Sequence, residues 1–122
     1  MAAILIVDDD ETILNVISKI LEYHGYTVHK AINVAHAMAI LELNWVDLIL
    51  LDLTMPGKSG TYIFSYLEEN FPSVKIVIHS GHELENHPEK ELIKSKSSAF
   101  LSRGEEIPIM LRKLKEVLKL KD

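Results

Sequence analysis

The sequence predicts a doubly wound α/β domain, with a five-stranded parallel sheet and five helices. Short, solid apolar runs alternate along the chain with apolar residues at helical spacing. Strands that alternate with helices in this way favour a parallel sheet. The length of 122 residues is that of one domain, and no repeat, low-complexity tract or linker divides it. We therefore expect residues 1–122 to form a single domain.

Five apolar runs are expected to form the strands. Ala3–Val7 and Leu48–Leu51 contain only apolar residues, as strands buried on both faces do. Tyr26–Ala31 is a weaker strand, and Lys75–Ile78 and Ala99–Leu101 complete the set.

The segments between these runs carry apolar residues three or four positions apart, as on one face of a helix. These residues are Ile13, Ile17, Ile20 and Leu21; Val34, Ala37, Met38 and Leu41; Ile63, Phe64 and Leu67; and, after Pro108, Met110, Leu111, Leu114, Val117 and Leu118. Gly25 is a natural stop for the first helix, and Asn33 is an expected N-cap for the second. Glu89–Lys96 is expected to be a short helix with Pro88 in its first turn.

The composition excludes several classes of function. The chain has no cysteine, which excludes disulfides, zinc–thiolate sites and thiol catalysis. Its net charge of −5 gives no basic footprint for nucleic acid or for an anionic membrane. No stretch approaches the roughly 20 apolar residues that span a bilayer, and no signal peptide is recognised. A cytoplasmic location is the default expectation.

Acidic residues follow two of the predicted strands. Asp8, Asp9 and Asp10 come after the first strand, and Asp52 comes directly after the third. Ligands of open parallel sheets bind at the carboxyl ends of the strands, where these carboxylates would meet. Such a cluster calls for a divalent cation, and Asp52 becomes a candidate nucleophile beside it. Two other aspartates fit structural roles, Asp10 as the N-cap of the first helix and Asp47 at the entrance of the third strand.

Three landmarks in order make the chain similar to the response-regulator receiver domain, over nearly its whole length. They are the acidic pair Asp8-Asp9, the phrase Leu51-Asp52-Leu53-Thr54-Met55-Pro56-Gly57 with a later Gly60, and Ser80-Gly81 after the fourth strand. The resemblance implies a flavodoxin-like receiver fold. It also implies that Asp52 accepts a phosphoryl group from a histidine of a sensor kinase or phosphotransfer protein, and that a downstream protein or output domain responds.

The resemblance also assigns roles to individual residues. Asp8, Asp9 and Asp52 would hold Mg²⁺, with Asp8 acting through water and the carbonyl of Thr54 completing the protein ligands. The hydroxyl of Ser80 would donate to a phosphoryl oxygen. Phe100 stands where the family has its switching aromatic residue, and it could equally be an ordinary core residue.

The chain departs from the family after the fifth strand, where Arg103-Gly104 replaces Lys-Pro. An arginine has a planar fork that can grip two oxygens, whereas a lysine has a compact ammonium group. A cis peptide bond before glycine would cost about 3–4 kcal/mol, so we expect a trans Arg103–Gly104 bond and a repositioned, looser loop. Either Arg103 does the work of the lysine imperfectly, or phosphorylation no longer drives a switch.

Other signals are weaker. Gly57-Lys58-Ser59 resembles the end of a phosphate-binding loop, but Asp52 stands where the first glycine should be. We expect His79, His82 and His87 to be surface residues and not zinc ligands.

Three functions therefore stay open: a Mg²⁺-dependent phosphorelay receiver, a pseudo-receiver that binds its partner without phosphorylation, and a phosphohydrolase with an aspartyl nucleophile. The last lacks the second aspartate that such enzymes use two residues later, because Thr54 stands there. We expect no enzymatic activity beyond self-phosphorylation and self-dephosphorylation.

Overall fold

The computed structural model describes residues 2–53, 62–80 and 84–119. Predictions that concern Thr54, the Gly57–Gly60 turn, Gly81 or His82 lie outside these ranges. The strands are β1 (Ala3–Val7), β2 (Thr27–Ala31), β3 (Leu48–Leu51), β4 (Lys75–Ser80) and β5 (Ala99–Ser102). The helices are α1 (Glu11–Tyr23), α2 (Val34–Leu43), α3 (Tyr62–Asn70), α4 (Lys90–Lys96) and α5 (Ile107–Lys119).

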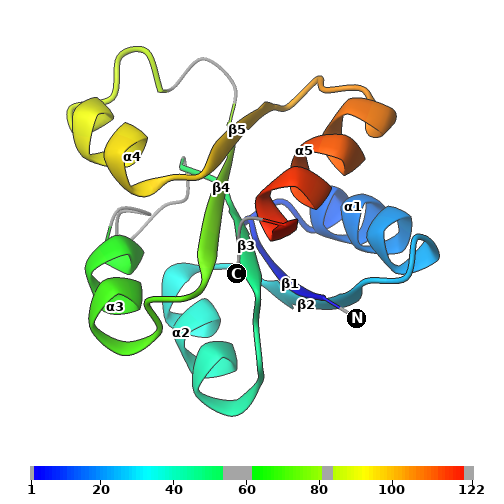
Figure 1. Cartoon of the computed structure of the whole chain (residues 1–122), viewed down its shortest axis with the longest axis horizontal. Helices are drawn as coiled ribbons and strands as arrows, with labels where there is room; N and C mark the ends of the chain where they lie inside the picture. The colour runs from blue at the N-terminus through cyan, green and yellow to red at the C-terminus, as the bar shows by residue number, and fades with distance from the viewer. Residues whose placement is uncertain (1, 54–61, 81–83, 120–122) are drawn as a thin grey trace.

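The five strands form one parallel sheet in the order β2-β1-β3-β4-β5. Helices α1 and α5 cover one face of the sheet, and α2, α3 and α4 cover the other (Figure 1). This is the predicted doubly wound α/β fold with five strands and five helices. The order reverses beside β1, so β1 and β3 are neighbours in the sheet although α1, β2 and α2 separate them in the chain.

The core consists of two apolar layers because side chains alternate across each strand. Leu5, Ile49 and Ile78 belong to the layer beneath α2, α3 and α4. Ile6, Leu50 and Val77 belong to the layer beneath α1 and α5. β1 and β3 are buried at every residue, which explains their uninterrupted apolar sequence.

The predicted caps of α1 and α2 are confirmed. The carboxylate of Asp10 caps α1, accepting from the backbone N–H groups of Thr12 and Ile13, and Asn33 caps α2 through the N–H of His36. After α1 the chain turns at Gly25, whose φ of 94° is strained for residues with a Cβ atom.

Several strand and helix boundaries differ from the prediction. β2 begins at Thr27 and not at Tyr26, β4 extends through Ser80, and β5 extends through Ser102. The sequence prediction ended β4 and β5 too early because the residues at their ends have polar side chains. The backbones of these residues still pair in the sheet, as Ser80 does with Ser102. Pro88 lies in a turn before α4 and not in its first turn.

The prediction that His79 is a surface residue is wrong. His79 is only 6% exposed, because β4 continues past Ile78 and is flanked by β3 and β5. Burial lowers the pKa of its imidazole, and the nearby positive charge of Arg103 lowers it further. The ring is therefore neutral at neutral pH.

The helices within the described residues are too short and too polar to cross a membrane.

Asp47 marks the entrance of β3, at the opposite end of the sheet from Asp52, as predicted. Its buried carboxylate accepts hydrogen bonds from the backbone N–H of Ala3 at 2.8 Å and from Nε1 of Trp45 at 2.9 Å. Asp47 therefore ties the first residue of β1 to the start of β3 at the base of the sheet.

We predict that Asp47→Ala lowers the free energy of unfolding by about 2–3 kcal/mol, because the N–H of Ala3 loses its buried side-chain acceptor. Urea unfolding followed by circular dichroism measures this loss. Asp47→Asn, which keeps one acceptor oxygen, should lose less. An Asp47→Ala protein as stable as the wild type would contradict this role.

Candidate functional site

The pairing register of β1 and β3 brings Asp8 and Asp52 together. Val7 pairs with Leu51 across β1 and β3, and Asp8 and Asp52 are the next residues of the two strands. Backbone hydrogen bonds continue past the strand ends, from the N–H of Asp8 to Ala31 and from the N–H of Asp52 to Val7, both at 3.0 Å. The side chains of Asp8 and Asp52 are 1% and 0% exposed. Two carboxylates are thus buried side by side.

Asp9 completes a group of three carboxylates. One ligand atom from each of Asp8, Asp9 and Asp52 lies within 4.8 Å of the others, and Asp9 is exposed while the other two are buried. Mg²⁺ prefers oxygen ligands at about 2.0–2.1 Å, so ligands on opposite sides of the ion are roughly 4 Å apart. The spacing and the chemistry of these oxygens fit a small divalent cation with little rearrangement.

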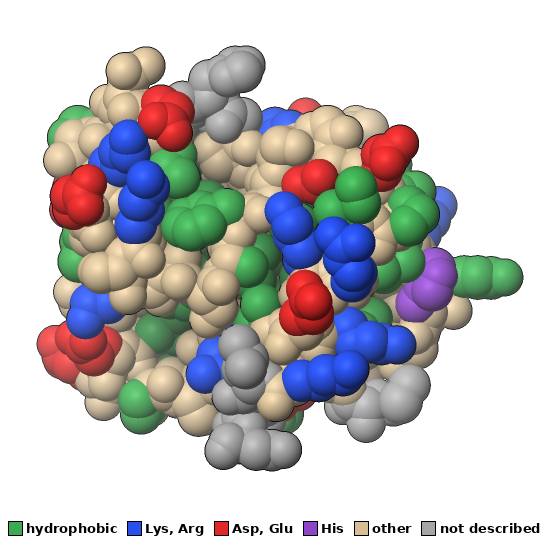
Figure 2. All heavy atoms as spheres, turned by 45° about the horizontal axis from the view of Figure 1, so that its top comes forward, with side chains coloured by type: hydrophobic (Ala, Val, Ile, Leu, Met, Phe, Trp, Pro, Cys, Tyr) green, Lys and Arg blue, Asp and Glu red, His purple; other side chains and the backbone are tan. Residues whose placement is uncertain are grey.

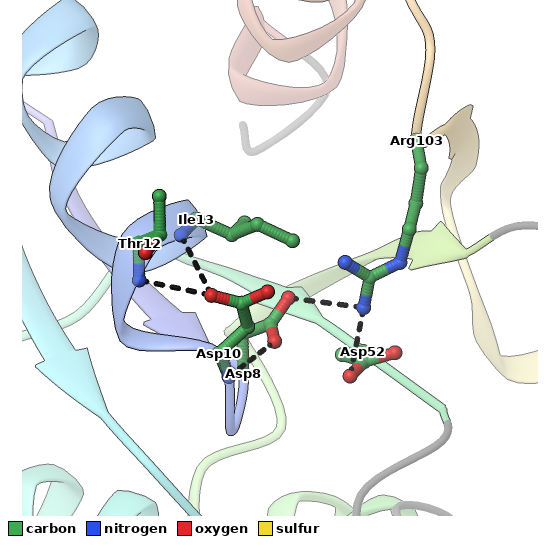
Figure 3. Close-up of polar contacts among 6 residues, drawn as sticks. All are labelled: Asp8, Asp10, Thr12, Ile13, Asp52 and Arg103. Carbon is green, nitrogen blue, oxygen red and sulfur yellow. Dashed lines mark hydrogen bonds and ion pairs between the residues drawn. The ribbon is translucent and has the colours of Figure 1, made fainter.

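Asp10 lies beside this group but does not join it. Its carboxylate points to the first turn of α1 and accepts from the N–H groups of Thr12 at 2.9 Å and Ile13 at 3.3 Å (Figure 3). Its own N–H donates to Oδ1 of Asp8 at 2.9 Å. The cap of α1 therefore also holds Asp8 in position.

Arg103 reaches into the carboxylate group from the segment between β5 and α5. Its Nη2 atom lies 3.2 Å from Oδ2 of Asp8 and 2.9 Å from Oδ2 of Asp52, so one nitrogen bridges the two buried carboxylates (Figure 3). The Arg103–Gly104 bond is trans, as predicted. The turn is closed by the N–H of Glu105, which donates to the carbonyl of Ser102 at 3.1 Å.

The electrostatic cost of the site is visible at Asp8. Burial, together with the negative charges of Asp52 and Asp9, raises the pKa of its carboxyl from 3.8 to about 6. The N–H of Asp10 and the charge of Arg103 oppose this shift. A cation at this site therefore keeps Asp8 ionised.

Ser80 lies at the carboxyl end of β4 and is buried. It lines a cavity of about 280 Å³ together with Leu84, Phe100 and Lys113. Phe100 is half-buried and packs against the core layer beneath α2, α3 and α4. Neither arrangement tests the predicted phosphoryl contact of Ser80 or the switching role of Phe100.

Sequence reasoning missed two residues around Arg103. Glu105 lies two residues beyond it, and its carboxylate accepts from the N–H of Ser102 and from Nζ of Lys113. Lys113 also donates to the carbonyl of Phe100 at 3.1 Å, so it is not simply a solvated lysine of α5. Its spacing from Met110 and Val117, which face the core, was the available signal.

Comparison with known proteins identifies the family. Residues 4–119 match the family model of the response regulator receiver domain. The chain belongs to this family. Its sheet order, with the acidic residues at the ends of β1 and β3, agrees with the receiver fold.

Several relatives place this receiver domain in context. A putative NtrX-like response regulator of Rickettsia felis is 30% identical over 123 residues, covering 97% of this chain and 26% of that protein. PilH of Pseudomonas aeruginosa is 42% identical over 60 residues, covering 49% of this chain and 50% of PilH. A CheY-like receiver domain protein from Methanospirillum hungatei JF-1 superposes with a TM-score of 0.88 at 28% identity, covering 99% and 96% of the two chains. The chain thus spans about a quarter of the NtrX-like protein, and the stretch that matches PilH spans half of PilH and half of this chain.

We predict that Asp8→Asn stabilises the metal-free receiver domain at pH 7.5, by about 1–2 kcal/mol. The folded-state pKa of Asp8 is raised, so the ionised carboxyl costs stability above pH 6, and this cost disappears as the pH falls towards 4. Urea unfolding at pH 7.5 and pH 4.5 should show a gain at the higher pH only. Asp10→Asn, which keeps a capping oxygen, is the matched control and should show no such gain. An equal effect of Asp8→Asn at both pH values would contradict the prediction.

Proposed function

We propose that this receiver domain accepts a phosphoryl group on Asp52 in a phosphorelay and thereby changes its affinity for a partner protein. The observation that carries the proposal is the convergence of Asp8, Asp9 and Asp52, two of them buried, at the carboxyl end of the sheet. A buried carboxylate beside two others destabilises the folded state unless a cation offsets its negative charge.

The proposed chemistry is transfer from a phosphohistidine of a sensor kinase or phosphotransfer protein. A carboxylate oxygen of Asp52 attacks the phosphorus atom, the phosphorus–nitrogen bond breaks, and an acyl phosphate forms. The leaving imidazole takes up a proton. No metabolite is turned over, so the domain is a phosphoacceptor and not an enzyme in the ordinary sense.

Mg²⁺ is the cofactor that we propose for this site. When bound, it offsets the negative charge that gathers on the transferring phosphoryl group. Asp9 and Asp52 would contact it directly, Asp8 would act through water, and the carbonyl of Thr54 stays the predicted fourth ligand. The hydroxyl of Ser80 is the proposed partner of a phosphoryl oxygen, and Arg103 is proposed to contact another once Asp52 carries the phosphoryl group.

The proposed partner surface comprises α4, β5 and α5. More than half of the Lys and Arg residues of the chain lie on α4 and α5, although the chain has a net charge of −5. Figure 2 shows these positive side chains gathered over α4 and over α5. The surface therefore suits an acidic protein or output domain. We propose protein partners, with no direct contact to nucleic acid or membrane, and a cytoplasmic location.

We predict that incubation with acetyl phosphate and Mg²⁺ adds one phosphoryl group to the wild-type protein and none to Asp52→Asn. Intact-protein mass spectrometry measures the adduct, which should also be absent when EDTA removes the ion. Asp10→Asn keeps the three carboxylates Asp8, Asp9 and Asp52 and should be labelled normally. Failure of the wild type to label at high donor concentrations would contradict the proposal.

A second function is favoured by one specific observation, the bridge from Arg103 to Asp8 and Asp52. A permanent internal cation would suit a pseudo-receiver, which binds its partner without phosphorylation. In that case the wild type and Asp52→Asn bind the partner equally in pull-down experiments with the sensor kinase or output protein.

A further inference from the structure

The side chain of Arg103 lies between two environments. On one side are the carboxylates of Asp8 and Asp52. On the other is a cavity of about 280 Å³ between α1 and α5, lined mainly by apolar side chains such as Ile13, Ile17 and Met110. Its polar lining residues are Arg103, His79, Glu105 and Thr12.

The guanidinium group of Arg103 lies in the region that a metal ion bound by Asp8 and Asp52 would use. Nη2 lies 3.2 Å from Oδ2 of Asp8 and 2.9 Å from Oδ2 of Asp52, which are ordinary distances for a charged pair. An ion that binds both carboxylates must come within about 2.1 Å of their oxygens. Two cations this close together in a buried site repel each other strongly.

We propose that Arg103 is an exchangeable internal cation, which competes with the divalent ion for Asp8 and Asp52 and moves into the cavity between α1 and α5 when the ion binds. The inference rests on the metal site of the proposed function. It adds that occupation of the site by the ion is coupled to the position of the segment between β5 and α5.

The cavity is suited to receive the guanidinium group. Its apolar walls fit the aliphatic part of the side chain, which needs no polar partner. Glu105 also lines the cavity, and Arg103 would share its carboxylate with Lys113 and the N–H of Ser102. The imidazole of His79 is neutral, so it does not repel the incoming cation.

The test compares Mg²⁺ binding by the wild type, Arg103→Met and Lys19→Met, using isothermal titration calorimetry at pH 8.5, where Asp8 is ionised in each. Lys19 is an exposed residue of α1, and Lys19→Met is the matched control because it also removes one positive charge. We expect Arg103→Met to bind Mg²⁺ about tenfold more tightly, since the ion no longer displaces an internal cation. Lys19→Met should bind like the wild type. Equal affinities in all three proteins would overturn the proposal.

A double-mutant cycle with Glu105→Gln tests whether Arg103 moves towards Glu105 when Mg²⁺ binds, or whether its positive charge merely weakens Mg²⁺ binding from a distance. If Glu105 holds the displaced guanidinium group, Glu105→Gln weakens Mg²⁺ binding about threefold in the wild type and has no effect in the Arg103→Met background. The same weakening in both backgrounds would overturn the movement of Arg103 into the cavity.

Thermal unfolding gives a readout that is independent of phosphorylation. Without the ion, Arg103→Met should melt below the wild type because two buried carboxylates lose their cation. With saturating Mg²⁺ this difference in melting temperature should close.

If no protein in the series binds Mg²⁺, the metal site of the proposed function fails together with this inference. If all bind equally, only the inference fails.

Discussion

Two carboxylates buried side by side, Asp8 and Asp52, are the constraint around which the rest of the site is arranged. Their positions follow from the pairing of Val7 with Leu51, so neither can be moved without breaking the central sheet. Negative charges in this environment need a cation nearby, and Arg103 meets that need from a distant part of the chain. The fold thus carries a local electrostatic cost at the carboxyl end of its sheet, where ligands of such folds bind.

The base of the sheet is built differently. Asp47 is also buried, yet it accepts hydrogen bonds from two neutral donors, the N–H of Ala3 and the indole of Trp45. These hydrogen bonds tie the carboxylate to the backbone of β1 and to a neighbouring indole. The same residue type therefore fastens β1 to β3 at one end of the sheet and, at the other end, lies beside the charge of Arg103. The partners of each carboxylate make the difference.

Sequence patterns predicted the architecture because its two periodicities are strong: solid apolar runs in β1 and β3, and amphipathic spacing in the helices. They also predicted the capping role of Asp10, whose side chain acts within three residues of its own backbone, and the position of Asp47 at the start of β3. They failed at His79, since burial of a polar residue depends on how far β4 extends between its neighbours. The bridging contacts of Arg103 and the bonds of Lys113 depend on tertiary packing, which no local pattern encodes.

The site lies beside two cavities. Arg103 and His79 line the cavity between α1 and α5, whereas Ser80 and Phe100 line a second cavity along β5. Glu105 lines both cavities, and Lys113 links its carboxylate to the carbonyl of Phe100. A change of charge at Asp52 that moves Arg103 would therefore act on Glu105 and, through Lys113, on β5 and α5. The segment after β5 is thus the place where electrostatics at the strand ends can alter the outer surface of the domain.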